Sequence, residues 1–243
     1  MIKAILFDLD GTLLNRDESV QLFVANQYER LQNHLNHISK ETYISRFIHL
    51  DNHGYVWKDK VYEQLIREYA ITDLTSKELL QDYLENFKYF TVPFPNLLQM
   101  LESLKQQDFQ LGMITNGFGK FQMDTIEALK IKHYFDAILV SEWEGLKKPD
   151  PAIFNRALHL LKVKPTESVY IGDHPKNDIN AAQNIGMETI WKRSCLWETA
   201  STKYIINDLM EIPSLIKKMN HLNLLDVDNR NHNILETKQS REK

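Results

Sequence analysis

Cysteine is almost absent from this chain of 243 residues, in which Cys195 is the single example. One cysteine excludes an internal disulfide and a zinc site built from several cysteine thiolates. Such scarcity fits a reducing compartment. We therefore expect a cytoplasmic protein, and the length of the chain is sufficient for a sizeable apolar core.

The sequence also lacks long hydrophobic runs and an excess of basic residues. No apolar segment approaches the roughly 20 residues that a membrane-spanning helix needs, and the first residues lead into an apolar strand pattern rather than a signal peptide. Lys and Arg number 29 against 33 Asp and Glu, which gives a formal net charge of -4. We therefore expect no membrane and no nucleic-acid partner, while the oligomeric state stays open.

One short stretch near the N-terminus carries most of the chemical information. The apolar run of residues 4–7 reads as a buried strand and is followed by Asp8, Asp10, Gly11 and Thr12. Two carboxylates so close together repel each other unless a cation lies between them, and a hard divalent cation bound by oxygen atoms is the simplest solution. Such a cation can in turn hold a phosphate. The alternative is an Asx-turn that only ends the strand.

The rest of the chain divides into two patterns. Residues 15–91 show apolar positions at helical spacing and no clear strand, which predicts a helical bundle. From residue 92 onward, strand and helix patterns alternate, which predicts an α/β fold with a doubly wound parallel sheet covered on both faces. We therefore expect a catalytic core of residues 1–14 and 92–225, an inserted helical cap domain of residues 15–91, and a polar tail of residues 226–243.

Polar residues follow the predicted strands where each one ends. The strand patterns cover residues 4–7, 109–115, 137–140, 168–172, 188–191 and 204–206. Ligands bind outside the carboxyl ends of the strands in such a sheet. Beyond the first strand, these ends carry Thr115, Asn116, Gly117, Lys148, Asp173 and Asp178. Together with Asp8 and Asp10, this set predicts a site for a metal ion and a phosphate.

These segments resemble the four motifs of the haloacid dehalogenase superfamily of hydrolases. The first motif is similar to Asp8-x-Asp10-Gly11-Thr12, the second to Thr115-Asn116-Gly117, the third to Lys148-Pro149-Asp150-Pro151, and the fourth to Gly172-Asp173 through Asp178. The resemblance covers residues 1–14 and about 92–206. The helical insert resembles the small cap that the superfamily places directly after its first motif.

The resemblance implies a phosphatase that hydrolyses a small-molecule phosphomonoester through an aspartyl-phosphate. Asp8 would be the nucleophile, and Asp10 would act first as general acid and then as general base. Dehalogenases of the superfamily lack the second aspartate because a halide needs no proton to leave, so Asp10 favours phosphoester chemistry. A 2-haloacid dehalogenase, a phosphomutase and a phosphate-binding protein without turnover are the alternatives.

The resemblance also assigns the binding residues. Mg²⁺ would be held by Asp8, Asp173 and the backbone carbonyl of Asp10. Lys148 would offset negative charge in the transition state. The phosphoryl oxygens would be held by Thr115 and by the backbone N–H groups of Asn116 and Gly117.

Several neighbouring residues allow more than one interpretation. The motif favours Lys148 over Lys147 as the lysine of the site. We expect Asp178 to act behind the metal ligands, for example as a partner of Lys148, rather than as a direct ligand. Asp150 should start a helix, and His174 should face solvent or substrate because Mg²⁺ prefers oxygen.

A loop in the predicted cap is a weaker candidate for substrate recognition. Gly54 interrupts the helical pattern among polar, aromatic and cationic residues. We expect either that substrate contacts come from Asn52, His53, Trp57 and Lys58, or that the loop is an ordinary connection between two helices.

Overall fold

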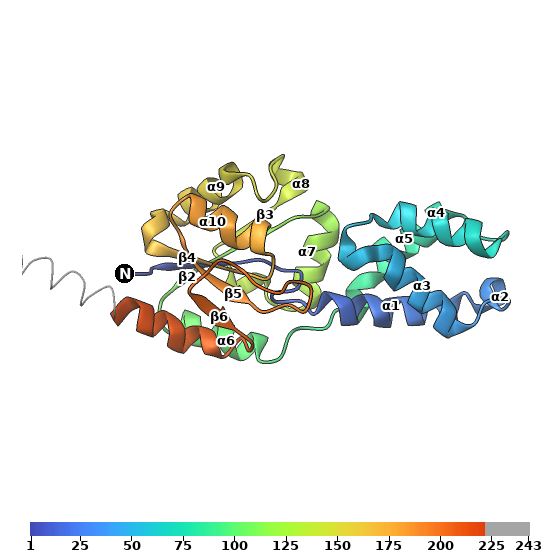
Figure 1. The fold of residues 1–243 in the computed structure, drawn as a ribbon, viewed down its shortest axis with the longest axis horizontal. Coiled ribbons are helices and arrows are strands. Elements are labelled where there is room, and N and C mark those ends of the chain that lie inside the picture. The colour runs from blue at the N-terminus through green and yellow to red at the C-terminus, as the bar shows by residue number, and fades with distance from the viewer. Residues whose placement is uncertain (222–243) are drawn as a thin grey trace, which may run out of the picture. The chain divides into compact units, whose positions relative to one another are not determined.

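The computed structural model describes residues 1–221 (Figure 1). It divides into two compact units. The first, here called the core unit, comprises Met1–Leu13, Phe94–Phe118 and the chain from His133 onward; the second, the helical unit, comprises Leu14–Pro93 and Gly119–Lys132. The predicted polar tail of residues 226–243 lies outside the described residues. No helix within residues 1–221 has both the length and the apolar character to cross a membrane.

The core unit contains a six-stranded parallel sheet in the order β3-β2-β1-β4-β5-β6. The strands are β1 (Ala4–Phe7), β2 (Gln110–Thr115), β3 (Ala137–Val140), β4 (Ser168–Gly172), β5 (Glu188–Lys192) and β6 (Tyr204–Ile206). This confirms the predicted α/β fold with a doubly wound parallel sheet. The strand order reverses between β1 and β4, where a sheet of this kind opens a crevice at its carboxyl edge.

Helices cover both faces of this sheet. Figure 1 shows α9 (Pro151–Leu161) and α10 (Ala181–Asn184) on one side, with α6 (Leu97–Lys105) and the helix of residues 211–221 on the other. The strands are therefore apolar on both faces, and all four residues of β1 are buried. The remaining short elements are α8 (Ser141–Glu144), η3 (Lys132–Tyr134), η4 (Pro165–Glu167) and the π-helical turn η5 (Pro175–Asn180).

The helical unit has its own aromatic core. Its elements are α1 (Arg16–Arg30), α2 (Gln32–Leu35), α3 (Lys40–Asp51), η1 (Asn52–Gly54), α4 (Lys58–Tyr69), α5 (Ser76–Asn86), η2 (Phe87–Phe90) and α7 (Gly119–Ala128). The ring of Phe121 in α7 stacks on Tyr83, with centroids 5.3 Å apart, and lies 5.0 Å from the ring of Phe87. These contacts explain why α7, predicted within the core domain, groups with the helical unit.

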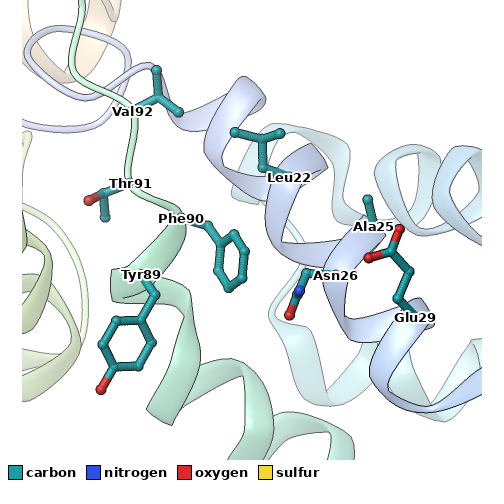
Figure 2. Close-up of a pocket in the computed structure, with 8 residues that line it drawn as sticks. All are labelled: Leu22, Ala25, Asn26, Glu29, Tyr89, Phe90, Thr91 and Val92. Atoms are coloured by element: carbon teal, nitrogen blue, oxygen red, sulfur yellow. The ribbon is translucent and has the colours of Figure 1, made fainter.

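A groove of about 400 Å³ runs along α1 in the helical unit (Figure 2). Leu22 of α1 forms part of one wall, and Tyr89 and Phe90 of η2 form part of the other. None of the four cap-loop residues predicted to contact substrate lines this groove.

Candidate active site

Three carboxylates meet at the carboxyl ends of β1 and β4. Asp8 directly follows β1, Asp173 directly follows β4, and Asp178 lies in the turn η5. One ligand atom of each side chain lies within 4.8 Å of the other two, and all three residues are buried. Among the described residues, the side chain of Asp10 is not part of this group. Asp10 follows Asp8 by two residues and is partly exposed.

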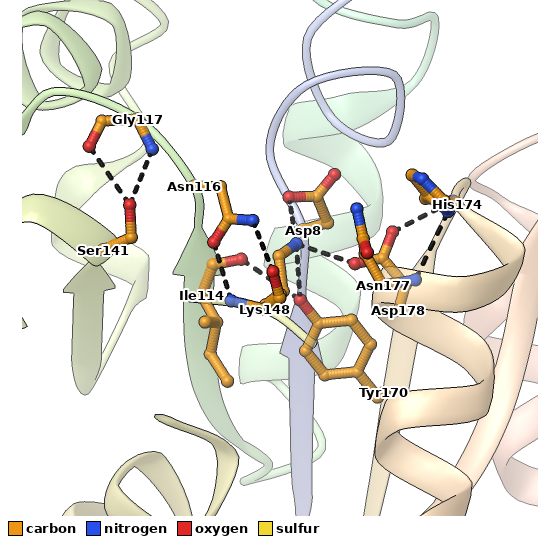
Figure 3. A network of polar contacts seen from close by, with 10 residues as sticks. All are labelled: Asp8, Ile114, Asn116, Gly117, Ser141, Lys148, Tyr170, His174, Asn177 and Asp178. Carbon is orange, nitrogen blue, oxygen red and sulfur yellow. Dashed lines mark hydrogen bonds and ion pairs between the residues drawn. The ribbon is translucent and has the colours of Figure 1, made fainter. Parts of the chain in front are cut away.

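Lys148 reaches into this group of carboxylates (Figure 3). Its Nζ donates to Oδ1 of Asp8 at 2.6 Å and to Oδ1 of Asp178 at 2.7 Å. Only 4% of Lys148 is exposed, whereas the neighbouring Lys147 lies on the surface. Of the two adjacent lysines, Lys148 is therefore the one in the site, and Asp178 is its partner.

Burial controls the protonation of the group. It raises the pKa of Asp8 from 3.8 to about 7, although Lys148 opposes the shift. Burial, followed by the charges of Asp178 and Asp8, raises the pKa of Asp173 well above its ordinary value. Burial alone would lower the pKa of Lys148, but Asp178 and Asp8 raise it, so the lysine is charged.

One lysine cannot offset three ionised carboxylates, so the fully ionised group would carry an excess of negative charge. Oxygen donors at this spacing suit a hard cation, which the buried group can hold. A divalent cation would also favour the ionised form of each carboxylate.

Two glycines allow the carboxylates to approach the backbone. Gly11 has φ +81°, and a Cβ atom at this position would lie 2.5 Å from Oδ2 of Asp173. A Cβ atom on Gly172 would lie 2.5 Å from Cγ and Oδ2 of Asp178. A side chain at either glycine would displace the carboxylate beside it.

The residues at the end of β2, predicted to bind phosphate, also position the backbone of Lys148. Thr115 is fully buried. The side-chain amide of Asn116 donates to the backbone carbonyl of Lys148 at 3.0 Å and accepts from the backbone N–H of Lys148 at 2.9 Å. The N–H of Gly117 donates to Oγ of Ser141 at 2.9 Å. This N–H, predicted to hold a phosphoryl oxygen, is thus engaged within the protein (Figure 3).

Sequence reasoning missed the hydroxyl of Tyr170 in β4. It accepts from Nζ of Lys148 at 3.1 Å and donates to the backbone carbonyl of Ile114 at 3.1 Å. A tyrosine within an otherwise apolar buried strand was the available signal, because a buried hydroxyl needs a partner. Asp150 behaves as predicted and caps α9 by accepting from the N–H of Ala152.

The predicted cap-loop residues have partners within the helical unit. Lys58 is 2% exposed and donates to Asp51, which also accepts from Nη1 of Arg16 at 2.9 Å. Nδ1 of His53 lies 3.1 Å from a carboxylate oxygen of Asp17.

Asn52 is exposed with φ 45°, and Trp57 is partly buried. Substrate contact by these four residues, Asn52, His53, Trp57 and Lys58, stays a prediction.

A doubly wound sheet with acidic and lysine side chains at its switch point is typical of α/β enzymes that act on anionic substrates. The chain belongs to the haloacid dehalogenase-like hydrolases, whose family profile matches residues 5–192. A glyceraldehyde 3-phosphate phosphatase of Methanocaldococcus jannaschii is 30% identical over 90% of this chain and 99% of its own length.

Solved structures agree with this assignment. A haloacid dehalogenase-type phosphatase of Thermococcus onnurineus is 27% identical, with a TM-score of 0.63 over 88% of this chain and 98% of its own. A 2-haloacid dehalogenase of Pseudomonas syringae is also 27% identical, with a TM-score of 0.60 over 90% of this chain and 100% of its own. Together with the named phosphatase relatives, these findings confirm the predicted superfamily and the predicted enzyme class, a phosphatase.

Proposed function

We propose that this chain is a Mg²⁺-dependent phosphatase that hydrolyses a small phosphomonoester through an aspartyl-phosphate on Asp8. The observation that carries the proposal is the position of Lys148, whose Nζ bridges Asp8 and Asp178 beside the carboxylate of Asp173. This arrangement provides a nucleophile, a cation for the transferring phosphoryl group and oxygen ligands for a metal ion. The exposed Cys195 fits a reducing compartment, so we extend the proposal to a cytoplasmic enzyme.

The proposed chemistry needs two steps. A carboxylate oxygen of Asp8 attacks phosphorus, the bond from phosphorus to the leaving oxygen breaks, and Asp10 gives that oxygen a proton. Asp10 then takes a proton from a water molecule, which attacks phosphorus and frees Asp8 and inorganic phosphate. Mg²⁺, held by Asp8, Asp173 and the backbone carbonyl of Asp10, would supply positive charge to the phosphoryl oxygens. Thr115 and the backbone of Asn116 complete the proposed phosphate site.

The substrate class is proposed from the relatives. The phosphatase of Methanocaldococcus jannaschii is named for a three-carbon aldehyde phosphate. We therefore propose a short phosphomonoester and place glyceraldehyde 3-phosphate first in a test panel. Asp10 favours this reaction over removal of a halide, which requires no general acid.

The test is release of inorganic phosphate from a panel of phosphomonoesters, with Mg²⁺ and with EDTA. We expect release that requires Mg²⁺ and is concentrated on few compounds. Asp8→Asn should abolish it, while Asp108→Asn, an exposed aspartate of the core unit, should leave it unchanged. Asp10→Asn should accumulate protein that carries one phosphoryl group on the peptide containing Asp8, detected by mass spectrometry after acid quenching.

Other outcomes would contradict the proposal in distinct ways. Phosphate release that persists in EDTA would contradict the dependence on Mg²⁺. Full turnover by Asp8→Asn would contradict the assignment of Asp8 as the nucleophile. Halide release from a 2-haloacid would indicate the dehalogenase, and an isomerised sugar phosphate would indicate the phosphomutase.

A further inference from the structure

The loop that carries Asp173 and Asp178 is capped by a histidine side chain. Nδ1 of His174 accepts from the backbone N–H groups of Lys176 at 3.1 Å and Asn177 at 3.3 Å. Ser, Thr, Asp or Asn usually takes this capping position at the start of a helix. Because Nδ1 accepts these bonds, it carries no proton and is not available to a metal ion.

The backbone of His174 is tied to Asp178 in both directions. Its N–H donates to Oδ2 of Asp178 at 3.0 Å, and its carbonyl accepts from the N–H of Asp178 at 3.0 Å (Figure 3). The other carboxylate oxygen of Asp178 receives Nζ of Lys148. The position of this turn therefore determines where Asp178 meets the lysine.

Two tryptophans hold the same loop from the side of β5. The imidazole of His174 packs against the indole of Trp197, with ring centroids 4.7 Å apart and planes inclined by 35°. The indole N–H of Trp191 donates to the backbone carbonyl of Asp173 at 2.7 Å, and this contact is buried. Trp191 and Trp197 belong to one apolar cluster with Ile179 and Ala200.

We propose that His174 is a positioning residue, whose imidazole cap and packing on Trp197 set the spacing between the carboxylates of Asp173 and Asp178. This inference rests on the proposed function, in which Asp173 binds the metal ion. The sequence predicted a histidine that faces solvent or substrate. The structure instead shows a half-buried ring bonded to the backbone of its own turn.

The test compares three histidine variants by their affinity for Mg²⁺, measured by calorimetry. We expect His174→Ala to weaken binding about 10- to 100-fold, the range for partners that orient metal ligands. His174→Asn should recover most of this loss because asparagine also caps a helix start. His159→Ala, at an exposed histidine of α9, is the matched control and should bind like the wild type. At saturating Mg²⁺, KM should change less than kcat.

A second readout is independent of metal and activity. In the metal-free protein, amide hydrogen exchange at Lys176 and Asn177 should accelerate at least about tenfold in His174→Ala, because both N–H groups lose their acceptor. If His174→Ala does not fold, Trp191→Phe removes the indole N–H that donates to the carbonyl of Asp173, together with part of the ring volume, and should also weaken Mg²⁺ binding.

The outcomes separate this inference from the proposed function. Unchanged exchange and unchanged Mg²⁺ affinity in His174→Ala would overturn the positioning role. A His174→Asn variant as impaired as His174→Ala would overturn the capping explanation. If the wild type neither binds Mg²⁺ nor releases phosphate, the proposed function is overturned, and with it the role of His174 in metal binding. Accelerated amide exchange in His174→Ala would then support only the capping of the turn by His174.

Discussion

The side-chain amide of Asn116 binds both backbone polar groups of Lys148, at 3.0 Å to the carbonyl and at 2.9 Å from the N–H. Asn116 follows β2, and Lys148 lies beyond β3 in the loop before α9. The amide thus determines where the backbone of the lysine lies, and the lysine side chain spans from there to Asp8. A residue predicted to act through its backbone N–H also acts through its side chain.

Asn116→Ala should therefore impair catalysis by displacing Lys148. Both lost hydrogen bonds are worth about 1 kcal/mol each, so we expect turnover to fall at least about tenfold. Asn116→Asp keeps the acceptor oxygen and loses the N–H donor. Its turnover should lie between that of the alanine variant and that of the wild type. Steady-state kinetics and thermal unfolding measure the two effects. Wild-type turnover in Asn116→Ala would contradict this explanation.

Lys148→Met should be far more damaging than Lys147→Met, although both remove one positive charge. The first leaves buried carboxylates without their cation, which costs about 3–5 kcal/mol of unfolding free energy at neutral pH. Turnover should fall about 10²- to 10³-fold or more. Lys147→Met changes an exposed lysine, and we expect its unfolding free energy to differ from the wild type by about 0.5 kcal/mol or less. Denaturant unfolding of both variants checks this, and equal losses would refute the assignment of Lys148.

Gly11→Ala should lose metal-dependent activity, while Gly145→Ala should retain it. Both glycines have positive φ, +81° and +63°, so each alanine costs about 1–2 kcal/mol of backbone strain. Only at Gly11 would the new Cβ atom meet a neighbour, Oδ2 of Asp173, because no heavy atom lies within 4 Å at Gly145. We expect the larger loss of stability in Gly11→Ala, which adds this steric contact to the backbone strain, and a loss of Mg²⁺ affinity in that variant alone. Calorimetry measures the affinities, and equal Mg²⁺ affinities in the two variants would contradict the role of Asp173 as a metal ligand.

Binding of Mg²⁺ should depend on pH. Burial raises the pKa of Asp8 in the metal-free protein to about 7, and metal binding requires the ionised form. Affinity should therefore rise between about pH 6 and 8, with on the order of one proton released per ion near pH 7. Calorimetry in two buffers of different ionisation enthalpy counts these protons. Affinity that stays constant from pH 6 to 8.5 would rule out this coupling.

The same pKa shift makes a prediction for stability without metal. The unfolded carboxyl group loses its proton near pH 3.8, whereas folded Asp8 keeps its proton up to about pH 7. Between these values the folded state binds more protons, so the unfolding free energy should fall as pH rises. Added Mg²⁺ should restore stability more at pH 8 than at pH 5. Thermal unfolding at both values tests the sign.

Gln27 should stabilise the helical unit. Its Nε2 donates to Oδ2 of Asp82 at 2.9 Å, and its Oε1 accepts from the buried hydroxyl of Tyr62 at 2.9 Å. Gln27→Ala leaves that hydroxyl unpaired, which costs about 1–3 kcal/mol. Gln21→Ala, at an exposed position of the same helix, should cost about 0.5 kcal/mol or less. Chemical denaturation measures the unfolding free energy of both variants. An unchanged unfolding free energy in Gln27→Ala would mean that water reaches the hydroxyl of Tyr62.

The positions of the strands along the chain, their parallel sheet and the grouping of the carboxylates were accessible from the sequence. Each strand is a short apolar run with turn residues behind it, and this pattern is local in the chain. In a parallel sheet all carboxyl ends meet at one edge, so polar residues at those ends must gather there. Asp8, Asp173 and Asp178 could therefore be assigned to one site before their distances were known.

Contacts between distant side chains were decided by tertiary structure alone. Three such contacts join residues more than 20 positions apart. They are the hydrogen bond between Lys148 and the hydroxyl of Tyr170, the hydrogen bond between Gly117 and the hydroxyl of Ser141, and the stacking of Phe121 on Tyr83. Side-chain direction and exact register determine such contacts, and neither is encoded in local apolar periodicity. The sequence by itself thus determined the α/β architecture, the superfamily motifs and the acidic edge. Only the folded chain decided which side chains hold Lys148 and Asp178 in place, because those bonds exist only once distant elements pack together.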